Sequence, residues 1–422
     1  MDKFVIRGNK PLSGKMKVQG AKNAALPIIA GSLLISSGET VLENIPPLRD
    51  IDTLIAMLTH LGAKVSHDRS EGVMTIDASN LTSNKAPYEL MRKMRASFLV
   101  LGPILQRMGE AQVSLPGGCA LGPRPVDYHI KGFAGLGAEI SEQKGYVIAR
   151  AKQLKGNTIY FDRPSHTGTE NIMFGAVMAK GTTHIINAAC DPEVVDLSKF
   201  LSSAGAKIKG AGTPSMTIEG VAKLKPIKHT VMGDRLEAGT LLMAAMATEG
   251  NILISGAETS HLEIVLRKLA EAGADIKTTK EGIKLTAPKK IKSVDVVTFP
   301  FPGFPTDLQA CMTALLTKGD GLSRVRETVF QDAFTYVMEL NRLGADISVT
   351  ANEAAITGVK KLTGASVMAP HIRAGAGLVI AGLAALGQTE VLRVYHIDRG
   401  YYRLEEKLRA LGGDIKRVSN GS

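Results

Sequence analysis

The stretch Leu61-Gly62-Ala63-Lys64-Val65, LGAKV, is the first of six closely similar segments in the chain. In each segment a glycine is followed within three positions by a charged residue and then by a β-branched residue. The other five are LGAEI at Gly137, AGAKI at Gly205, AGADI at Gly273, LGADI at Gly344 and LGGDI at Gly412. Successive glycines lie about 70 residues apart, so the 422-residue chain is predicted to contain six structural repeats.

An amphipathic segment with an acidic residue near its start precedes each of these glycines. Residues 50–65, DIDTLIAMLTHLGAKV, and residues 398–415, DRGYYRLEEKLRALGGDI, are two examples. An acidic start, an apolar stripe and a terminal glycine are typical of a capped helix, and the β-branched residue that follows favours a strand. Each repeat is therefore predicted to carry one capped outer helix that leads into a strand.

A second glycine in each repeat precedes a strand-like run, as in GETVLENI from Gly38 and GNILISGA from Gly250. Before it comes an alanine-rich, almost wholly apolar segment, such as residues 24–34, 238–247 and 374–386. A helix that is apolar all round must be buried, so six such segments predict interiors made of helices with sheets outside. The pattern alone leaves open whether the repeats stack as a solenoid or close in groups of three. Breaks are expected near Gly20 and within residues 223–234.

The composition favours a soluble cytoplasmic protein that attracts anions. Lys and Arg exceed Asp and Glu, which gives a formal net charge of +11, but the excess is diffuse and aromatic residues are few, which argues against nucleic-acid binding. The three cysteines, Cys119, Cys190 and Cys311, are far apart and odd in number, which favours a reducing compartment. No metal-ligand motif, signal peptide or membrane span is predicted.

Unusual polar residues fall at two places in the repeat. One is the start of the buried helix, and the other is the turn between the following strand and the outer helix. A single charge at a helix start usually faces solvent, but isolated charges beside all-apolar helices favour a ligand. The first group is Lys22, Asn23, Arg95, residues 165–171, Arg235, Asp307 and Arg373; the second is Cys119, Arg124, Asp191, Ser260, residues 327–332 and residues 396–399.

The segment SLPGGCALGPRPVD, residues 114–127, mounts Cys119 in a loop with three glycines and three prolines. Proline and glycine exclude a helix here, and Arg124 nearby would favour a lowered pKa of the Cys119 thiol. Packing alone is an equally good explanation for this cysteine. Cys311 lies in a buried run and is expected only to pack. Asp307 follows Pro305-Thr306, so helix capping alone would also account for it.

Five motifs together carry a resemblance to a known family. They are GAKNAALP at 20–27, MRAS at 94–97, the cysteine loop, FPTDLQA at 304–310 and YHIDRGY at 395–401. The chain resembles the UDP-N-acetylglucosamine 1-carboxyvinyltransferases, enolpyruvyl transferases of peptidoglycan synthesis, over its whole length. The resemblance implies an α/β fold, a two-domain inside-out α/β barrel of six βαβαββ repeats. Three repeats per domain would bury helices beneath outer sheets. Domain I would comprise 1–21 and 233–422 and close on domain II, 22–232, which carries the cysteine loop.

The resemblance also implies the reaction and its residues. The enolpyruvyl group of phosphoenolpyruvate would pass to the 3′-hydroxyl of UDP-N-acetylglucosamine with release of phosphate, without cofactor or metal. Cys119 would be the general acid and the target of fosfomycin, Asp307 the base, and Lys22, Arg124 and Arg399 the groups that hold phosphoenolpyruvate. The nucleotide-sugar contacts would be Asn23, Arg95, Arg124, Pro125, Val126, Asp127, Tyr128, His129, Arg163, Pro164, Ser165, His166, Asp307, Val329 and Arg373.

Three positions depart from the family's pattern. His166-Thr167 replaces a common Val-Gly pair, Ala333 replaces an arginine, and His371 replaces an acidic residue. These departures bear on the acceptor and the rate. Two alternatives therefore stay open at this point: enolpyruvyl transfer to another nucleotide or alcohol, and a non-catalytic paralogue that binds UDP-sugars.

Overall fold

The computed structural model describes residues 2–92, 94–115 and 126–419, with the Arg95 side chain left out. These residues form two compact units. Unit I contains residues 2–19 and 233–419, and unit II contains the described part of residues 20–232. The described chain passes between the units at Gln19–Gly20 and at Met232–Gly233.

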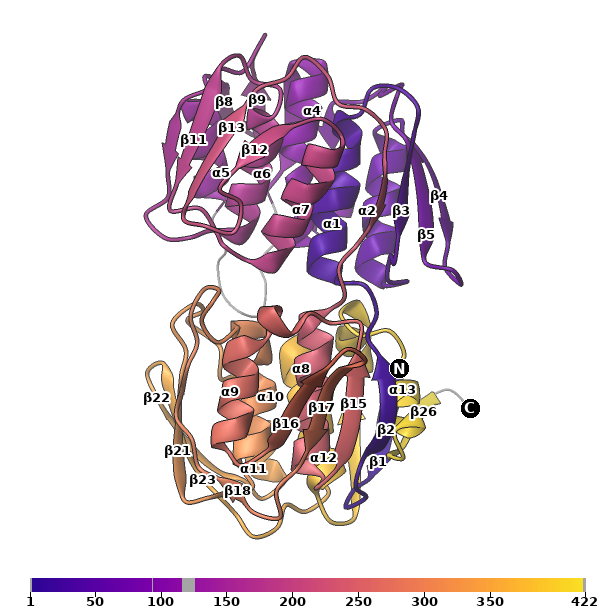
Figure 1. Ribbon diagram of the computed structural model, residues 1–422, viewed down its shortest axis with the longest axis vertical. Helices are drawn as coiled ribbons and strands as arrows, with labels where there is room; N and C mark the ends of the chain where they lie inside the picture. The colour runs from indigo at the N-terminus through magenta and orange to yellow at the C-terminus, as the bar shows by residue number, and fades with distance from the viewer. Residues whose placement is uncertain (1, 93, 116–125, 420–422) are drawn as a thin grey trace. The chain divides into compact units, whose positions relative to one another are not determined.

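Unit II has helices inside and sheets outside (Figure 1). Its inner helices are α1 (Lys22–Gly31), α4 (Leu101–Met108) and α6 (His166–Ala176), extended by the 3-10 turns η1 (Ser32–Leu34) and η2 (Arg95–Val100). Its outer helices are α2 (Arg49–His60), α5 (Asp127–Gly135) and α7 (Pro192–Ser203), with one short turn at α3 (Tyr88–Met91). Helix α4 packs on α6, and α1 contacts both η1 and η2.

Three four-stranded sheets cover this unit within the described residues. The first has the order β14 (Lys228–Thr230), β3 (Glu39–Glu43), β5 (Val73–Asp77), β4 (Lys64–Asp68). The second has the order β6 (Lys85–Ala86), β7 (Glu110–Ser114), β9 (Tyr146–Arg150), β8 (Glu139–Gln143). The third has the order β10 (Thr158–Tyr160), β11 (Thr182–Ile186), β13 (Ser215–Glu219), β12 (Lys207–Lys209).

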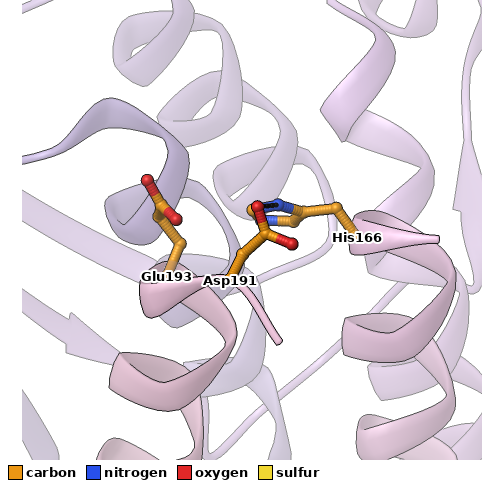
Figure 2. Close-up of side chains that lie close together, drawn as sticks. All are labelled: His166, Asp191 and Glu193. Atoms are coloured by element: carbon orange, nitrogen blue, oxygen red, sulfur yellow. Dashed lines mark ion pairs between the residues drawn. The ribbon is translucent and has the colours of Figure 1, made fainter. Parts of the chain in front are cut away.

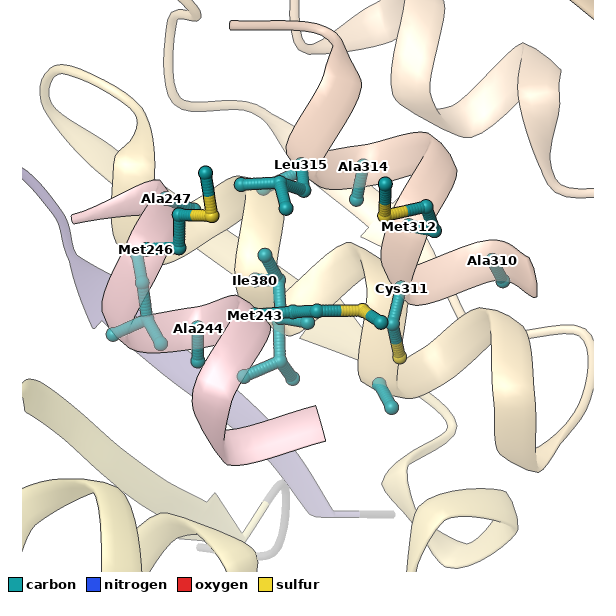
Figure 3. Close-up of a cluster of buried hydrophobic side chains, with 14 of the residues drawn as sticks. Met243, Ala244, Met246, Ala247, Ala310, Cys311, Met312, Ala314, Leu315 and Ile380 are labelled. Atoms are coloured by element: carbon teal, nitrogen blue, oxygen red, sulfur yellow. The ribbon is translucent and has the colours of Figure 1, made fainter. Parts of the chain in front are cut away.

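Unit I repeats this arrangement. Its inner helices are α8 (Arg235–Ala247), α10 (Gln309–Leu316) and α12 (Ile372–Ala384), and each of them packs on the other two. Figure 3 shows side chains from all three helices meeting in one apolar cluster, among them Met243, Met312 and Ile380. The outer helices are α9 (Glu263–Glu271), α11 (Val337–Arg342) and α13 (Leu404–Ala410); the 3-10 turns are η3 (Thr259–His261), η4 (Thr306–Leu308) and η5 (Val394–Arg399).

Three four-stranded sheets and one short pair surround the inner helices of unit I. One sheet has the order β16 (Asp275–Thr279), β17 (Gly282–Thr286), β15 (Asn251–Ser255), β2 (Ser13–Lys17). The second sheet has the order β19 (Val296–Val297), β21 (Leu322–Arg326), β23 (Glu353–Thr357), β22 (Asp346–Thr350). The third sheet has the order β24 (Ser366–Met368), β25 (Gln388–Leu392), β1 (Asp2–Arg7), β26 (Asp414–Ser419). The pair is β18 (Ile291–Lys292) with β20 (Gly319–Asp320).

The order of elements confirms the predicted fold class. Three repeats close around three inner helices in each unit, so the solenoid alternative is wrong. Two strands are exchanged between repeats: β2 precedes α1 but pairs in parallel with β15, and β14 precedes α8 but pairs in parallel with β3. Each of these strands pairs within the unit that the chain is about to leave, directly before one of the two crossings.

The signature glycines explain how each outer helix turns into a strand. All six have φ between 88° and 108°, a left-handed conformation that only glycine adopts without strain. The second glycine also has positive φ in five repeats, but at Gly250 the preceding Glu249 takes that conformation, with φ 56°. Gly250 is required for another reason, because a Cβ there would lie 2.2 Å from the Leu12 carbonyl oxygen.

The expected side-chain caps of the outer helices are absent from the described helices. None of α2, α5, α7, α9, α11 or α13 has a side-chain N-cap; their acidic residues lie in the first turn, where they interact with the helix dipole instead. Three of the inner helices are capped instead, by Ser165 at α6, Asp234 at α8 and His371 at α12. None of the described helices has both the length and the apolar composition needed to cross a bilayer.

Candidate functional site

Two predicted site residues of unit I, Asp307 and Arg373, form an ion pair. Asp307 sits in η4 directly after Pro305, and Arg373 is in the first turn of α12. The Arg373 Nε donates to the Asp307 Oδ1, and the two side chains are 17% and 30% exposed. No side chain caps η4, so the capping explanation for Asp307 is wrong. This carboxylate is oriented by a guanidinium and remains open to a ligand.

Arg373 also lies against an aromatic ring from the turn after β21. Its guanidinium carbon is 4.7 Å from the centroid of the Phe330 ring. Val329, the residue before Phe330 and a predicted nucleotide-sugar contact, has an exposed side chain. Asp307, Val329 and Arg373 therefore lie around one small region of unit I, reached from η4, α12 and the turn after β21.

Arg399 is the last residue of the 3-10 turn η5. Arg417 fixes this turn by hydrogen bonds to Asp398, the residue before Arg399. Arg417 donates to both carboxylate oxygens of Asp398, at 3.1 and 2.5 Å, and to Glu405 at 2.7 Å. Burial alone would lower the pKa of Arg417, but the bonds to these two carboxylates outweigh it and raise the pKa. His396, on the same turn, has a lowered pKa because it is partly buried and because Arg399 and Arg393 lie nearby.

In unit II, Lys22 is the first residue of the inner helix α1 and contacts the first turn of α2. Its Nζ lies 3.4 Å from the Asp50 Oδ2, and both side chains are largely buried. Asn23 follows it and is half-buried. A buried ammonium at a helix N-terminus, where backbone N–H groups also point outward, is a suitable partner for an anion.

The N-terminus of α6 carries a histidine between carboxylates. The His166 Nε2 is 3.0 Å from the Glu170 Oε1, and its Nδ1 is 3.5 Å from the Asp191 Oδ1 at the start of α7. Figure 2 shows the imidazole facing Asp191, with Glu193 beside it on α7. Burial alone would lower the pKa of His166, but the two carboxylates outweigh it and raise the pKa well above its ordinary value. His166, Asp191 and Glu193 are close enough together to surround a cation. When His166 is protonated, its imidazolium is itself the positive charge between the carboxylates.

Arg163 and Pro164, which precede α6, are exposed, and Ser165 caps the helix by accepting from the Gly168 amide. The segment thus presents an exposed guanidinium, helix amides and the His166 imidazole together.

The start of α5 is packed into unit II rather than left open. The His129 ring is buried; its Nδ1 lies 2.9 Å from the Asn171 Nδ2 and its Nε2 3.3 Å from the Thr167 Oγ1. Tyr128 packs edge-on against Phe161 at 5.5 Å. Val126 is buried, and the Asp127 Oδ2 lies 3.9 Å from the Lys131 Nζ. These contacts connect the end of the cysteine loop to the helix that carries His166.

Three predicted site residues, Cys119, Arg124 and Pro125, lie outside the described residues, as does the side chain of Arg95. Lys22 belongs to unit II and Arg399 to unit I. The other two cysteines are described. Cys311 is fully buried beside Thr240, and burial raises the pKa of its thiol to about 12, so it packs as predicted. Burial and Asp191 raise the pKa of Cys190.

Sequence reasoning missed the partners that hold these residues. Arg417 was not predicted at all, Asp50 was expected only as the acidic start of a helix, and Glu170 fell within residues 165–171 without a role. Asp191 and Glu327 were placed at the polar turn of the repeat without a role. A buried charge in an otherwise apolar pattern is the signal that would have pointed to them.

The comparisons with known proteins agree over the whole length. The profile of the EPSP synthase (3-phosphoshikimate 1-carboxyvinyltransferase) family matches residues 6–408. The chain is 51% identical over 419 residues to the UDP-N-acetylglucosamine 1-carboxyvinyltransferase of Desulfosudis oleivorans, covering 99% of this chain and 100% of that one. The chain belongs to the enolpyruvyl transferase family. The resemblance drawn from the five motifs is thereby confirmed.

Other relatives support this membership. The enolpyruvyl transferase is 53% identical over 422 residues to UDP-N-acetylglucosamine 1-carboxyvinyltransferase 2 of Carboxydothermus hydrogenoformans, with full coverage of both chains. Its fold matches the crystal structure of the enolpyruvyl transferase NikO from Streptomyces tendae with a TM-score of 0.89 at 22% identity, covering 100% of this chain and 99% of that one. An EPSP synthase structure from Acinetobacter baumannii matches with a TM-score of 0.77 at 18% identity, covering 99% of this chain and 100% of that one. These two likenesses establish the fold.

Proposed function

We propose that this enolpyruvyl transferase moves the enolpyruvyl group of phosphoenolpyruvate onto the 3′-hydroxyl of UDP-N-acetylglucosamine and releases phosphate. The observation that carries the proposal is the identity of 51% and 53%, over essentially the whole chain, to relatives that bear the name of this activity. The described geometry supports it with an oriented carboxylate at Asp307 and buried or half-buried cations at Lys22 and Arg399.

The proposed chemistry takes place in two steps that conserve protons. Asp307 accepts the proton of the 3′-hydroxyl while the hydroxyl oxygen bonds to C2 of phosphoenolpyruvate. The Cys119 thiol donates a proton to C3. The ketal that results then breaks its C2–O bond to phosphate and loses a proton from C3. That proton restores the thiol, and the proton on Asp307 leaves with the phosphate. Lys22, Arg124 and Arg399 hold the phosphate and carboxylate of phosphoenolpyruvate as fixed cations.

The nucleotide sugar is assigned to the remaining positions predicted from the sequence. The exposed Arg163 and the N-terminus of α6 suit a diphosphate, because guanidinium groups and helix amides both favour anions. Val329 and Asp307 suit the sugar. Closure of domain I on domain II during the reaction stays a prediction.

We also propose that the reaction is the first committed step of peptidoglycan synthesis and occurs in the cytoplasm. The three widely spaced cysteines favour such a reducing compartment. Loss of the activity would then affect the cell wall, and with it cell shape and division. Fosfomycin, an epoxide that mimics phosphoenolpyruvate, is expected to add its mass to Cys119 and not to Cys190 or Cys311.

The deciding experiment measures phosphate release from phosphoenolpyruvate with a panel of acceptors. UDP-N-acetylglucosamine should support turnover, and other UDP-sugars and shikimate 3-phosphate should not. Asp307→Asn should lower kcat by about 100-fold or more, since general bases contribute about that much. Asp320→Asn is the matched control, because Asp320 is an exposed carboxylate of the same unit that pairs with Lys290.

The alternatives predict different outcomes in the same assay. Turnover with another acceptor only would identify a different transferase. Calorimetric binding of UDP-N-acetylglucosamine without phosphate release would identify a non-catalytic paralogue. Either result contradicts the proposed function.

A further inference from the structure

A buried carboxylate in unit I, Glu327, lies at the end of β21 beside the region of Asp307 and Val329. Its side chain is 1% exposed, although an ionisable group is expensive to bury without partners. The strand β21 runs parallel to β19, so their carboxyl ends meet at the same edge of the sheet. Thr298 follows β19 as Glu327 follows β21, and the Thr298 hydroxyl donates to the Glu327 Oε1 at 2.7 Å.

Glu327 receives three further hydrogen bonds from two other segments. The Thr306 hydroxyl donates to its Oε2 at 2.8 Å, and the backbone amides of Val329 and Phe330 donate to its Oε1 at 2.7 and 3.3 Å. All four partners can act as donors, and a carboxylate can accept from all four. Asn352 fixes the backbone of Glu327 as well, since its carbonyl accepts from the Glu327 amide at 2.8 Å.

Two routes connect this carboxylate to Asp307. Thr306 is the residue directly before Asp307, so its bond to Glu327 fixes the start of η4. The Phe330 amide donates to Glu327, and the Phe330 ring lies against the guanidinium of Arg373. Arg373 in turn pairs with Asp307. The interactions therefore form a ring that begins and ends at Glu327.

We propose that Glu327 is a positioning residue for the acceptor: its carboxylate holds the η4 segment of Asp307 and the turn of Val329 in one fixed geometry. This inference rests on the proposed function, which assigns Asp307 and Val329 to the acceptor. Glu327 acts through Asp307 and Val329 and not by contact with phosphoenolpyruvate. Its loss therefore affects the nucleotide sugar and the chemical step, and leaves the apparent affinity for phosphoenolpyruvate unchanged.

The test compares steady-state constants of the full-length enzyme and its variants Glu327→Gln, Glu327→Ala and Thr306→Val. Glu327→Ala removes all four bonds and should lower kcat/KM for UDP-N-acetylglucosamine by about 100-fold, because a hydrogen bond to a charged group is worth about tenfold or more. Glu327→Gln keeps an acceptor for the Val329 and Phe330 amides and should lose about tenfold. Thr306→Val breaks only the link to η4 and should lower kcat while leaving the KM for phosphoenolpyruvate within twofold.

Glu339→Gln is the matched control. Glu339 is a carboxylate of the same unit that accepts a backbone amide, that of Met368 at 3.0 Å, and it lies in α11. Its variant should keep both KM values and kcat within twofold. A general loss of folding in the Glu327 variants would lower only the amount of active enzyme, so it would not change either KM.

Three results would overturn the inference: Glu327→Gln and Glu327→Ala with unchanged constants, a loss shared equally by Glu339→Gln, or an equal rise in both KM values. Should the parent enzyme bind UDP-N-acetylglucosamine without turnover, the proposed function fails alone. Calorimetry with the same variants then decides the inference, since Glu327→Gln should still weaken binding by about threefold or more. A parent that does not bind the nucleotide sugar contradicts both.

Discussion

The ion pair at the start of α6 predicts a stability difference that depends on pH. The variant is His166→Gln, which keeps most of the side-chain volume and can still donate to Glu170, but cannot carry a charge. Glu170 is 1% exposed, so the imidazolium is the cation that compensates it. Removing one partner of a buried ion pair costs about 3–5 kcal/mol. Since His166 is 28% exposed and the amide retains a bond, we expect about 2 kcal/mol.

The sign of the pH dependence follows from the raised pKa values. The native state binds the His166 proton more tightly than the unfolded chain does, so the stabilisation is complete below the ordinary pKa of about 6.5. It is lost as the pH rises through the higher native pKa. Burial raises the pKa of Glu170 and His166 opposes that shift, so in the variant the Glu170 carboxylate would be still harder to ionise. The difference between parent and variant should therefore be largest near pH 6 and shrink in alkaline solution.

The assay is thermal unfolding of parent and variant in a pH series from about 6 to 10. For a unit of about 200 residues, 2 kcal/mol corresponds to a fall in Tm of about 4–8 °C. His184→Gln is the control, because His184 lies on the surface and its side chain bonds only Thr217 among the described contacts. Its effect should stay within about 0.5 kcal/mol. A shift for His166→Gln that is absent near pH 6, or equal at every pH, would refute the reasoning.

Three further predictions concern unit I. A Cβ at Gly377 would lie 2.7 Å from the Ala310 carbonyl oxygen, so Gly377→Val should destabilise the α10–α12 contact by about 2–3 kcal/mol, seen as a lower urea midpoint. The pKa of about 12 predicts that Cys311 resists iodoacetamide at pH 8 in the folded protein and reacts only in urea, as peptide mass spectrometry would show. Arg417→Met leaves Asp398 without its two-point partner and should lower the free energy of unfolding by about 3 kcal/mol, whereas an unchanged Tm would contradict that role.

The elements of each repeat were predictable because their causes are local. The glycines that end the outer helices have positive φ, which is a property of a single residue and its neighbours. The apolar inner helices are equally clear, since no surface position would accept a helix such as α12 without a polar face. The N-caps were the exception: Asp50 lies inside the first turn of α2 and interacts with the dipole, and Asp398 lies in η5, before α13 begins at Leu404.

The places of Asp307 and Arg373 in the fold were predictable, but their contact was not. Asp307 and Arg373 were both expected at helix starts, yet nothing in the sequence pairs them, because η4 and α12 belong to different repeats. Glu327 shows the same limit. Its partner Thr298 reaches it because β19 and β21 run parallel and end at one edge, and Thr306 reaches it from η4, so of these three only the Val329 amide is a local partner.

From the sequence alone came the six repeats, the inner and outer helices and the family, because periodicity, glycine conformation and local motifs are all written along the chain. Only the tertiary structure decided that three repeats close around each core, that β2 and β14 exchange sheets, and which buried charges meet. The physical reason is that burial and pairing depend on distances between residues far apart in the chain. One repeat cannot cover its own inner helix, so its neighbours determine where every charge beside that helix finds a partner.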